Sequence, residues 1–188
     1  RAEDFEFSAL LAVALGYAVL AETLGMHFIL GAFVAGLFFV RRTIDSDVYD
    51  SIRTSVTNFT TGFFAPLFFA SIGLHLDLSA ATEIPAFLIF LIAAAFLGKL
   101  IGAGVPAYAT GFTVRDSIGI GSAMSARGAV ELIVAGIALE AGLFAHPSPA
   151  PPEVAYLFSA VVIMALVTTI LTPITLRPLL ASKDNTRQ

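Results

Sequence analysis

The sequence has no cysteine and no tryptophan, and charged residues make up only 13% of its 188 positions. The absence of cysteine excludes a disulfide scaffold, thiol chemistry and zinc sites built on cysteine. The formal net charge of -4, without a basic stripe, argues against binding to nucleic acid. Glycine loops for nucleotides, His-Glu-x-x-His motifs and nucleophile elbows are also missing, so we expect neither an enzyme nor a cofactor.

Hydrophobic residues, by contrast, make up 57% of the chain, and the mean hydropathy is +0.90. A soluble domain is roughly 45–50% apolar and about 25% charged. A helix that crosses a lipid bilayer needs about 20 mostly apolar residues. The sequence therefore predicts an all-α fold, a polytopic membrane helical bundle with six spanning helices, one of them interrupted. The predicted spans are residues 8–21, 27–40, 59–76, 84–108, 117–142 and 154–176.

The basic residues outside these spans all fall on one side of the predicted membrane, and the loops of the other side hold none. Because cytoplasmic loops carry the excess of Lys and Arg, both termini are expected in the cytoplasm, in a plasma or inner membrane. The chain begins with an arginine and lacks the basic start of a signal peptide, so we expect it to be a fragment of a longer protein. The basic residues on the cytoplasmic side are Arg1, Arg41, Arg42, Arg53, Arg115, Arg177, Lys183 and Arg187.

The two remaining basic residues, Lys99 and Arg127, fall inside predicted spans. Lys99 lies about 15 residues from one end of its span and about ten from the other, roughly 22 Å and 15 Å along a helix. A charge at that depth costs about 2.5–3.5 kcal/mol, so it normally faces the bundle interior and has a partner. Lys99 is therefore a candidate for an ion or proton pathway, with a structural ion pair or a snorkelling side chain as the alternative.

Arg127 and Glu131 are four residues apart, which places them on the same face of a helix. They can simply neutralise each other. Alternatively, the glycines and serines around them interrupt the helix over residues 124–128, at Met124, Ser125 and Gly128. Many secondary transporters build ion sites from such breaks, because a broken helix offers free backbone groups at mid-membrane.

Two of the prolines inside predicted spans, Pro66 and Pro173, carry a structural expectation. Pro66 is expected to kink the span 59–76, since its ring removes a backbone donor and crowds the preceding turn. Thr168, Thr169 and Thr172 precede Pro173, and we expect their hydroxyls to bond backbone groups that Pro173 frees.

Five short segments of the chain fit sequence motifs that follow one another in a fixed order. Gly31-Ala-Phe-Val-Ala-Gly36 fits a Gly-Ala-Phe-x-x-Gly pattern, and the segment from Pro66 to Leu74 fits Pro-x-Phe-Phe-x-x-x-Gly-Leu. Gly98-Lys99, the run 125–134 and the run 168–173 follow in order. In these segments the chain resembles the monovalent cation:proton antiporters of the cation:proton antiporter-2 family.

The resemblance implies the second, C-terminal half of an inverted-repeat transporter. Residues 1–82 would be helices of the scaffold or dimerisation type, residues 83–180 would be core-domain helices, and residues 181–188 a cytoplasmic tail. Lys99 occupies the position of the lysine that pairs with an acidic residue of the family's ion site. Arg127 and Glu131 match the motif on the family's interrupted helix. A homodimer is also implied.

One departure from the family matters for function. In the family, the aspartate of the ion site belongs to the first repeat. No predicted span of this chain contains an aspartate. The first repeat would therefore come from preceding sequence or from another chain. The expected function is half of a Na⁺ or K⁺:proton antiporter that works by alternating access. The alternatives are a non-transporting sensor or channel-like subunit and a small-anion symporter on the same fold.

Overall fold

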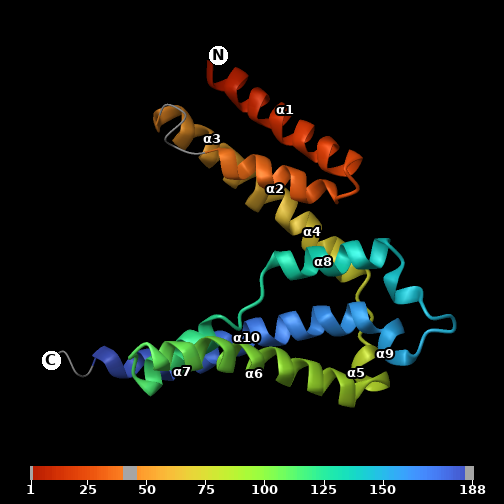
Figure 1. Ribbon diagram of the computed structural model, residues 1–188, viewed down its shortest axis with the longest axis vertical. Coiled ribbons are helices and arrows are strands. Elements are labelled where there is room, and N and C mark those ends of the chain that lie inside the picture. The colour runs from red at the N-terminus through yellow and green to blue at the C-terminus, as the bar shows by residue number, and fades with distance from the viewer. Residues whose placement is uncertain (1, 40–45, 185–188) are drawn as a thin grey trace. The chain divides into compact units, whose positions relative to one another are not determined.

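The computed structural model describes residues 2–39 and 46–184, and these residues form helices joined by short loops, with no strand among them (Figure 1). The chain divides into two compact units, residues 1–69 and residues 70–188. The helix α4 (Ala65–Leu74) carries the chain from one unit into the next. The all-helical class predicted from the sequence is confirmed for the described residues.

The first unit is built on a hairpin of two apolar helices, α1 (Ala2–Thr23) and α2 (Phe28–Phe38), which pack against each other (Figure 1). The turn between them needs Gly25, whose φ of 77° lies in the left-handed region that glycine adopts at little cost. The Nδ1 atom of His27 caps α2 by accepting a hydrogen bond of 3.4 Å from the backbone N–H of Ile29.

A longer helical run completes this unit. The helix α3 (Ser46–Phe59) passes without a loop into a π-helical turn, η1 (Thr60–Phe64), and then into α4. The N–H of Ala65 bonds to the carbonyl of Thr60 at this turn. Pro66, which cannot donate a backbone hydrogen bond, follows directly. The widened turn thus lies where the sequence predicted a proline kink.

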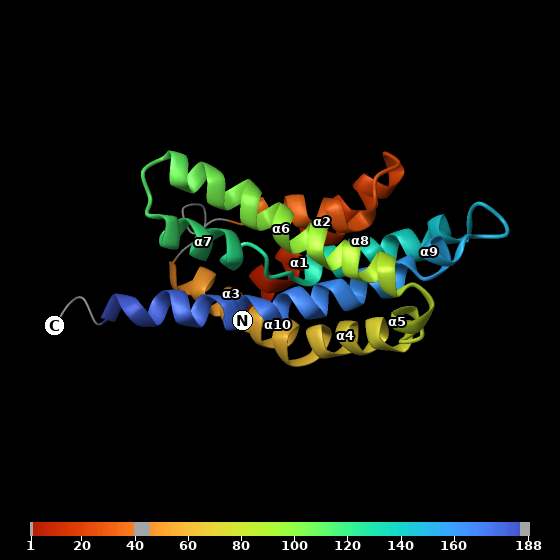
Figure 2. The same cartoon turned by 90° about the horizontal axis from the view of Figure 1, so that it is seen from below.

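The second unit is built around α10 (Leu157–Asp184), which has more buried residues than any other helix in the described part of the unit. The helices α6 (Pro85–Ala109) and α7 (Val114–Ala123) pack against it and against each other, and α8 (Ala129–Glu140) contacts it further along (Figures 1 and 2). Three short elements complete the unit: α5 (Ala80–Glu83), the 3₁₀ turn η2 (Leu143–Ala145) and α9 (Pro152–Ala155).

Small residues allow α6 and α7 to approach closely. A Cβ atom at Gly121 would lie 2.7 Å from the carbonyl oxygen of Leu100, and one at Gly104 would lie 3.1 Å from that of Ser117. The pairing of α5, α6 and α10 is instead made by apolar side chains around Ala80, Ile84, Leu88 and Ala160. Glycine contacts between backbones are typical of helix pairs in membranes, where packing replaces the hydrophobic effect.

The connection before α6 is fixed by polar contacts outside the apolar helices. Asp77 accepts a hydrogen bond of 2.9 Å from the backbone N–H of Ser79, and hydrogen bonding to Ser79 lowers the pKa of this carboxyl group below its usual value. The backbone N–H of Asp77 also donates to the hydroxyl of Ser159 at 3.0 Å. This loop is therefore attached to the beginning of α10.

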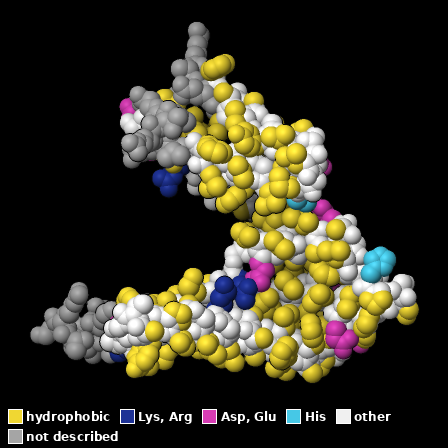
Figure 3. All heavy atoms as spheres, in the orientation of Figure 1, with side chains coloured by type: hydrophobic (Ala, Val, Ile, Leu, Met, Phe, Trp, Pro, Cys, Tyr) yellow, Lys and Arg dark blue, Asp and Glu magenta, His cyan; other side chains and the backbone are white. Residues whose placement is uncertain are grey.

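Two helices of the described chain, α6 and α10, are each long and apolar enough to cross a membrane. The other predicted spans correspond to shorter helices or to helices with an irregular turn, so the number of six crossings stays a prediction. Large hydrophobic side chains cover much of the surface seen in Figure 3. An apolar surface of this extent suits contact with lipid or with further helices rather than with water.

Several predicted boundaries differ from those of the structure. The predicted span 117–142, in which the sequence predicted an interruption, is two helices, α7 and α8. The last span begins later than predicted, after α9, and its helix continues past residue 176 to Asp184. The predicted tail 181–188 thus starts inside α10, and residues 185–188 lie outside the described part of the chain. The roles predicted for residues 1–82 and 83–180 stay predictions.

Candidate functional site

The chain leaves the helical conformation between α7 and α8, over residues 124–128. The last bonds of α7 are made by Met124 and Ser125, whose N–H groups donate to the carbonyls of Ile120 and Ser122. Gly128 is extended, with φ -106° and ψ -174°, and starts α8 without a side-chain cap. The break therefore presents one helix C-terminus and one helix N-terminus with backbone groups that helical bonding leaves free.

Local chemistry explains why the helix stops here. The hydroxyl of Ser125 is fully buried and donates to the carbonyl of Gly121 at 3.0 Å. A serine side chain that bonds the backbone in this way slightly destabilises a helix, and Gly128 adds backbone freedom three residues later. Together these residues favour the end of a helix at 125–128.

Arg127 and Glu131 lie across the start of α8. The Nη1 atom of Arg127 is 2.6 Å from Oε1 of Glu131, and the two side chains are 19% and 26% exposed. A carboxylate in the first turn also interacts favourably with the positive end of the helix dipole. The pair uses one atom of each group, while Nε of Arg127 and Oε2 of Glu131 are buried without a hydrogen-bond partner.

Lys99 comes from α6 and faces the same region. Its side chain is exposed, and among the described residues it makes no hydrogen bond or ion pair. Two adjoining hollows of about 490 and 350 Å³ share Lys99, Met124 and Arg127 as lining residues. We call them together the Lys99 groove. Small residues of α6 form one wall (Ala94, Ala95, Gly98, Gly102 and Ala103), and residues of the break and α8 form the other (Ala126, Gly128, Val130, Glu131 and Val134).

The structure therefore brings five of the six predicted site residues to one groove: Lys99, Met124, Arg127, Gly128 and Glu131. In Figure 3 basic and acidic side chains lie next to each other on the visible face of this unit.

The sixth predicted site residue, Ser125, does not line the groove, because its side chain turns inward to Gly121. Glu131 is the one acidic residue among those that line the groove, and Arg127 already engages it. Within the described residues, no group of three His, Asp or Glu side chains could hold a metal ion.

The sequence did not indicate the role of Thr169. Its Oγ1 atom lies 3.3 Å from the backbone nitrogen and 3.1 Å from the carbonyl oxygen of Arg127, and it bonds both groups. The expectation that Thr169 would serve groups freed by Pro173 was wrong, since its partner is 42 residues away in the break. The same expectation was wrong for Thr168 and Thr172, whose hydroxyls bond the carbonyls of Met164, Ala165 and Thr168 and not the carbonyl of Thr169 that Pro173 leaves free.

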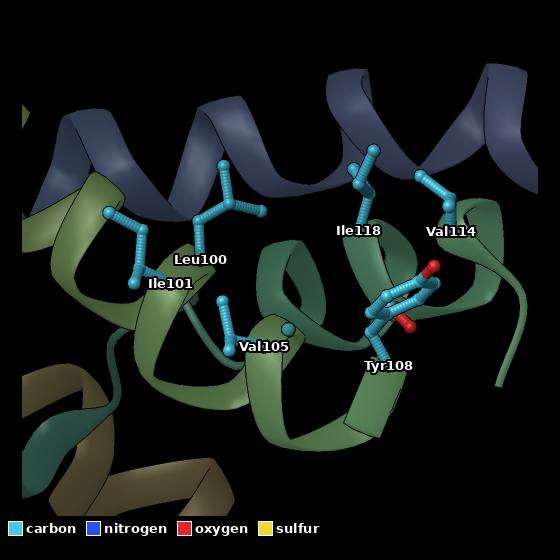
Figure 4. A pocket seen from close by; sticks show the side chains of 8 residues that line it. Leu100, Ile101, Val105, Tyr108, Val114 and Ile118 are labelled. Atoms are coloured by element: carbon cyan, nitrogen blue, oxygen red, sulfur yellow. The ribbon is translucent and has the colours of Figure 1, made fainter. Parts of the chain in front are cut away.

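A second hollow, of about 370 Å³, lies between α6 and α7 (Figure 4). Figure 4 shows apolar side chains lining it, with Tyr108 at one end. Ser117 is its only other polar lining residue, and its hydroxyl is buried without a partner. This hollow holds no charged side chain, whereas the Lys99 groove joins Lys99 to the free backbone groups of the break, so the Lys99 groove is the candidate site.

We predict that Arg127 and Glu131 are energetically coupled. Glu131→Gln should lower the stability of the folded protein by about 1–3 kcal/mol, less than for a fully buried pair, because it leaves the Arg127 guanidinium uncompensated. The double variant Arg127→Gln/Glu131→Gln should lose less than the sum of the two single losses. Thermal unfolding in detergent measures the cycle, and losses that simply add would show that the pair is not coupled.

Comparison with known proteins gives one consistent assignment. A family model described as the transmembrane sodium/hydrogen exchanger matches residues 1–182. The Na(+)/H(+)-K(+) antiporter GerN of Bacillus cereus is 34% identical over 184 residues, which cover 98% of this chain and 44% of that protein. A Na(+)/H(+) antiporter of Enterococcus hirae is 29% identical over 167 residues, covering 89% of this chain and 40% of that protein.

A third relative, K(+)/H(+) antiporter 1 of Saccharomyces cerevisiae, is 30% identical over 161 residues, covering 84% of this chain and 17% of that protein. The chain thus spans less than half the length of these relatives. The antiporter resemblance seen in its sequence motifs is confirmed over nearly all of its length. With the family model matching 182 consecutive residues and the broken helix lying within them, the chain belongs to the sodium/hydrogen exchanger family of membrane-spanning cation:proton antiporters.

Proposed function

We propose that this chain is the second half of a monovalent cation:proton antiporter and provides the basic side of its ion site. The family is one of transporters rather than enzymes, and the relatives are named for exchange of Na⁺ or K⁺ against protons. The observation that carries the proposal is the groove where Lys99 meets a broken helix. Secondary transporters bind ions near the membrane midplane at such discontinuous helices.

In the proposed cycle, Lys99 pairs with a carboxylate of the first repeat while no cation is bound. Lys99 makes no hydrogen bond or ion pair within the described chain, and its side chain opens on the groove. An arriving cation would compete for the carboxylate and release the ammonium group, which could then give up a proton. Movement of the core against the scaffold would expose the site to each side of the membrane in turn.

The ion pair of α8 favours a cation over an anion as the substrate. A small-anion symporter that used Arg127 to bind its substrate would need a free guanidinium, yet Nη1 of Arg127 is already bonded to Glu131 at 2.6 Å. Arg127 therefore contributes little net charge to the groove. The pair is better suited to hold the start of α8 in place, close to Lys99, than to bind an anion.

The cellular setting is part of the same proposal. The distribution of basic residues supports an orientation with both termini in the cytoplasm, and the membrane we propose is the plasma or inner membrane. The resemblance supports a homodimer. The first repeat, in the same chain or in another, would complete the transporter.

Proton flux in vesicles tests the proposal. Vesicles that contain the complete transporter, this chain together with its first repeat, are loaded with a pH-sensitive dye and acidified inside. Addition of NaCl or KCl should drive protons outward and raise the internal pH, whereas choline chloride should not. If neither cation moves protons although the folded protein is present in the vesicles, the antiporter proposal fails and a sensor role gains support.

A further inference from the structure

Thr169 makes a contact that no other threonine of α10 is described to make. Its hydroxyl bonds both backbone groups of Arg127, accepting from the N–H at 3.3 Å and donating to the carbonyl at 3.1 Å. The two residues are 42 positions apart, on α10 and in the break between α7 and α8. One side chain thus satisfies two backbone groups at the point where helical bonding has stopped.

The neighbouring threonines show how unusual this contact is. The hydroxyls of Thr168, Thr172 and Thr175 donate to carbonyls three or four residues earlier in α10. That is the ordinary behaviour of threonine inside a helix. The hydroxyl of Thr169 instead bonds the backbone of Arg127 in the break. Its contact therefore reflects the packing of the two segments and not the local preference of the residue.

The position of Thr169 in α10 adds to this picture. Pro173 lies four residues later and has no N–H to donate to the carbonyl of Thr169. The helix is thus locally weakened at the same turn that holds the break. The bond between Thr169 and Arg127 therefore holds the break against the weakened turn of α10.

We infer that Thr169 is a positioning residue that holds the broken helix in register with α10. By fixing the backbone of Arg127, it directs the Arg127 side chain toward Glu131 and sets where the break meets Lys99. The consequence for transport rests on the proposed function, whereas the contact itself does not. In the proposed cycle, a displacement of α10 would therefore also displace the backbone of Arg127 through this hydroxyl.

The test compares three variants of the complete transporter. Thr169→Val keeps a similar shape but has no hydroxyl, and Thr169→Ser keeps the hydroxyl. Thr175→Val is the matched control, because the hydroxyl of Thr175 bonds only carbonyls of α10, those of Leu171 and Thr172. Hydrogen–deuterium exchange is measured for the short peptide that contains residues 124–128, in which the Arg127 amide is one of the exchanging groups.

Thr169→Val should accelerate exchange of the Arg127 amide within this peptide by about five- to tenfold, the factor expected for one lost hydrogen bond. Thr169→Ser and Thr175→Val should exchange like the parent protein. In the flux assay, Thr169→Val should raise the cation concentration for half-maximal proton movement, and Thr169→Ser should restore it.

Unchanged exchange in Thr169→Val, or equal acceleration in Thr175→Val, would overturn the inference. So would normal cation dependence in a Thr169→Val protein whose break exchanges faster, because the contact would then not position the site. If the parent transporter moves no protons, the hydrogen–deuterium exchange experiment still decides whether Thr169 holds the break. Failure of the proposed function can therefore be distinguished from failure of this inference.

Discussion

Replacing Lys99 by alanine is expected to abolish cation-driven proton exchange and to leave the transporter folded. The side chain of Lys99 is exposed, and it lies on α6, whose most apolar stretch is only 6% buried inside this chain. Truncation therefore removes little packing. It does remove the ammonium group from the groove and leaves the opposing carboxylate of the proposed site unpaired, which costs on the order of 3–5 kcal/mol for a buried charge pair. Exchange should fall about a hundredfold or more.

Lys99→Arg separates the two roles proposed for this residue. A guanidinium can still pair with a carboxylate, but it does not release a proton in a protein. We expect Lys99→Arg to be as stable as the parent protein and still to lose exchange. Arg53→Ala is the control, because Arg53 is an exposed basic residue of α3 in the other unit.

The measurement is the initial rate of proton flux from vesicles, normalised to the amount of folded transporter. Full exchange by Lys99→Arg would show that the proton does not travel on Lys99. Full exchange by Lys99→Ala would remove Lys99 from the ion site altogether. A loss of exchange in Arg53→Ala would indicate that the assay responds to net charge and not to the groove.

Features that depend on local composition could be predicted from the sequence. The predicted span 84–108 agrees with α6 to within one residue at each end, because Pro85 fits a helix start and the apolar run is continuous. The break at residues 124–128 lies where serine and glycine surround a charged residue. Side chains that compete with helical bonds act on their immediate neighbours, so their effect is visible in the sequence.

Features that depend on distant contacts could not be predicted. The bond between Thr169 and Arg127 joins residues 42 positions apart, and three threonines nearby look the same in the sequence. An apolar run also predicts only the part of a helix that can lie in lipid. It does not predict the residue at which the helical hydrogen bonds end. Hence α10 continues beyond the last predicted span to Asp184, and α3 joins α4 through a π-helical turn.

The two glycines of the Gly-Ala-Phe-x-x-Gly segment should respond to alanine in opposite ways. A Cβ atom at Gly31 would overlap the carbonyl oxygen of Tyr17 and lie 2.8 Å from Cα of Ala18. Backbone atoms cannot move aside as a flexible side chain can, so α1 and α2 would have to separate. A Cβ atom at Gly36, on the same helix, would meet nothing within 4 Å. Gly31→Ala should therefore destabilise the hairpin by about 1–3 kcal/mol or more, and Gly36→Ala should stabilise it by about 0.5–1 kcal/mol.

The unfolding temperature of the complete transporter in detergent measures both changes. Both variants add the same methyl group to the same helix, so general effects on helix propensity cancel in the comparison. A lower unfolding temperature for Gly31→Ala, with a slightly higher one for Gly36→Ala, would show that the hairpin depends on close backbone contact at Gly31. Equal losses for both would mean that α2 requires small residues along its whole length, and the contact with Tyr17 would then not be the reason for the glycine at position 31.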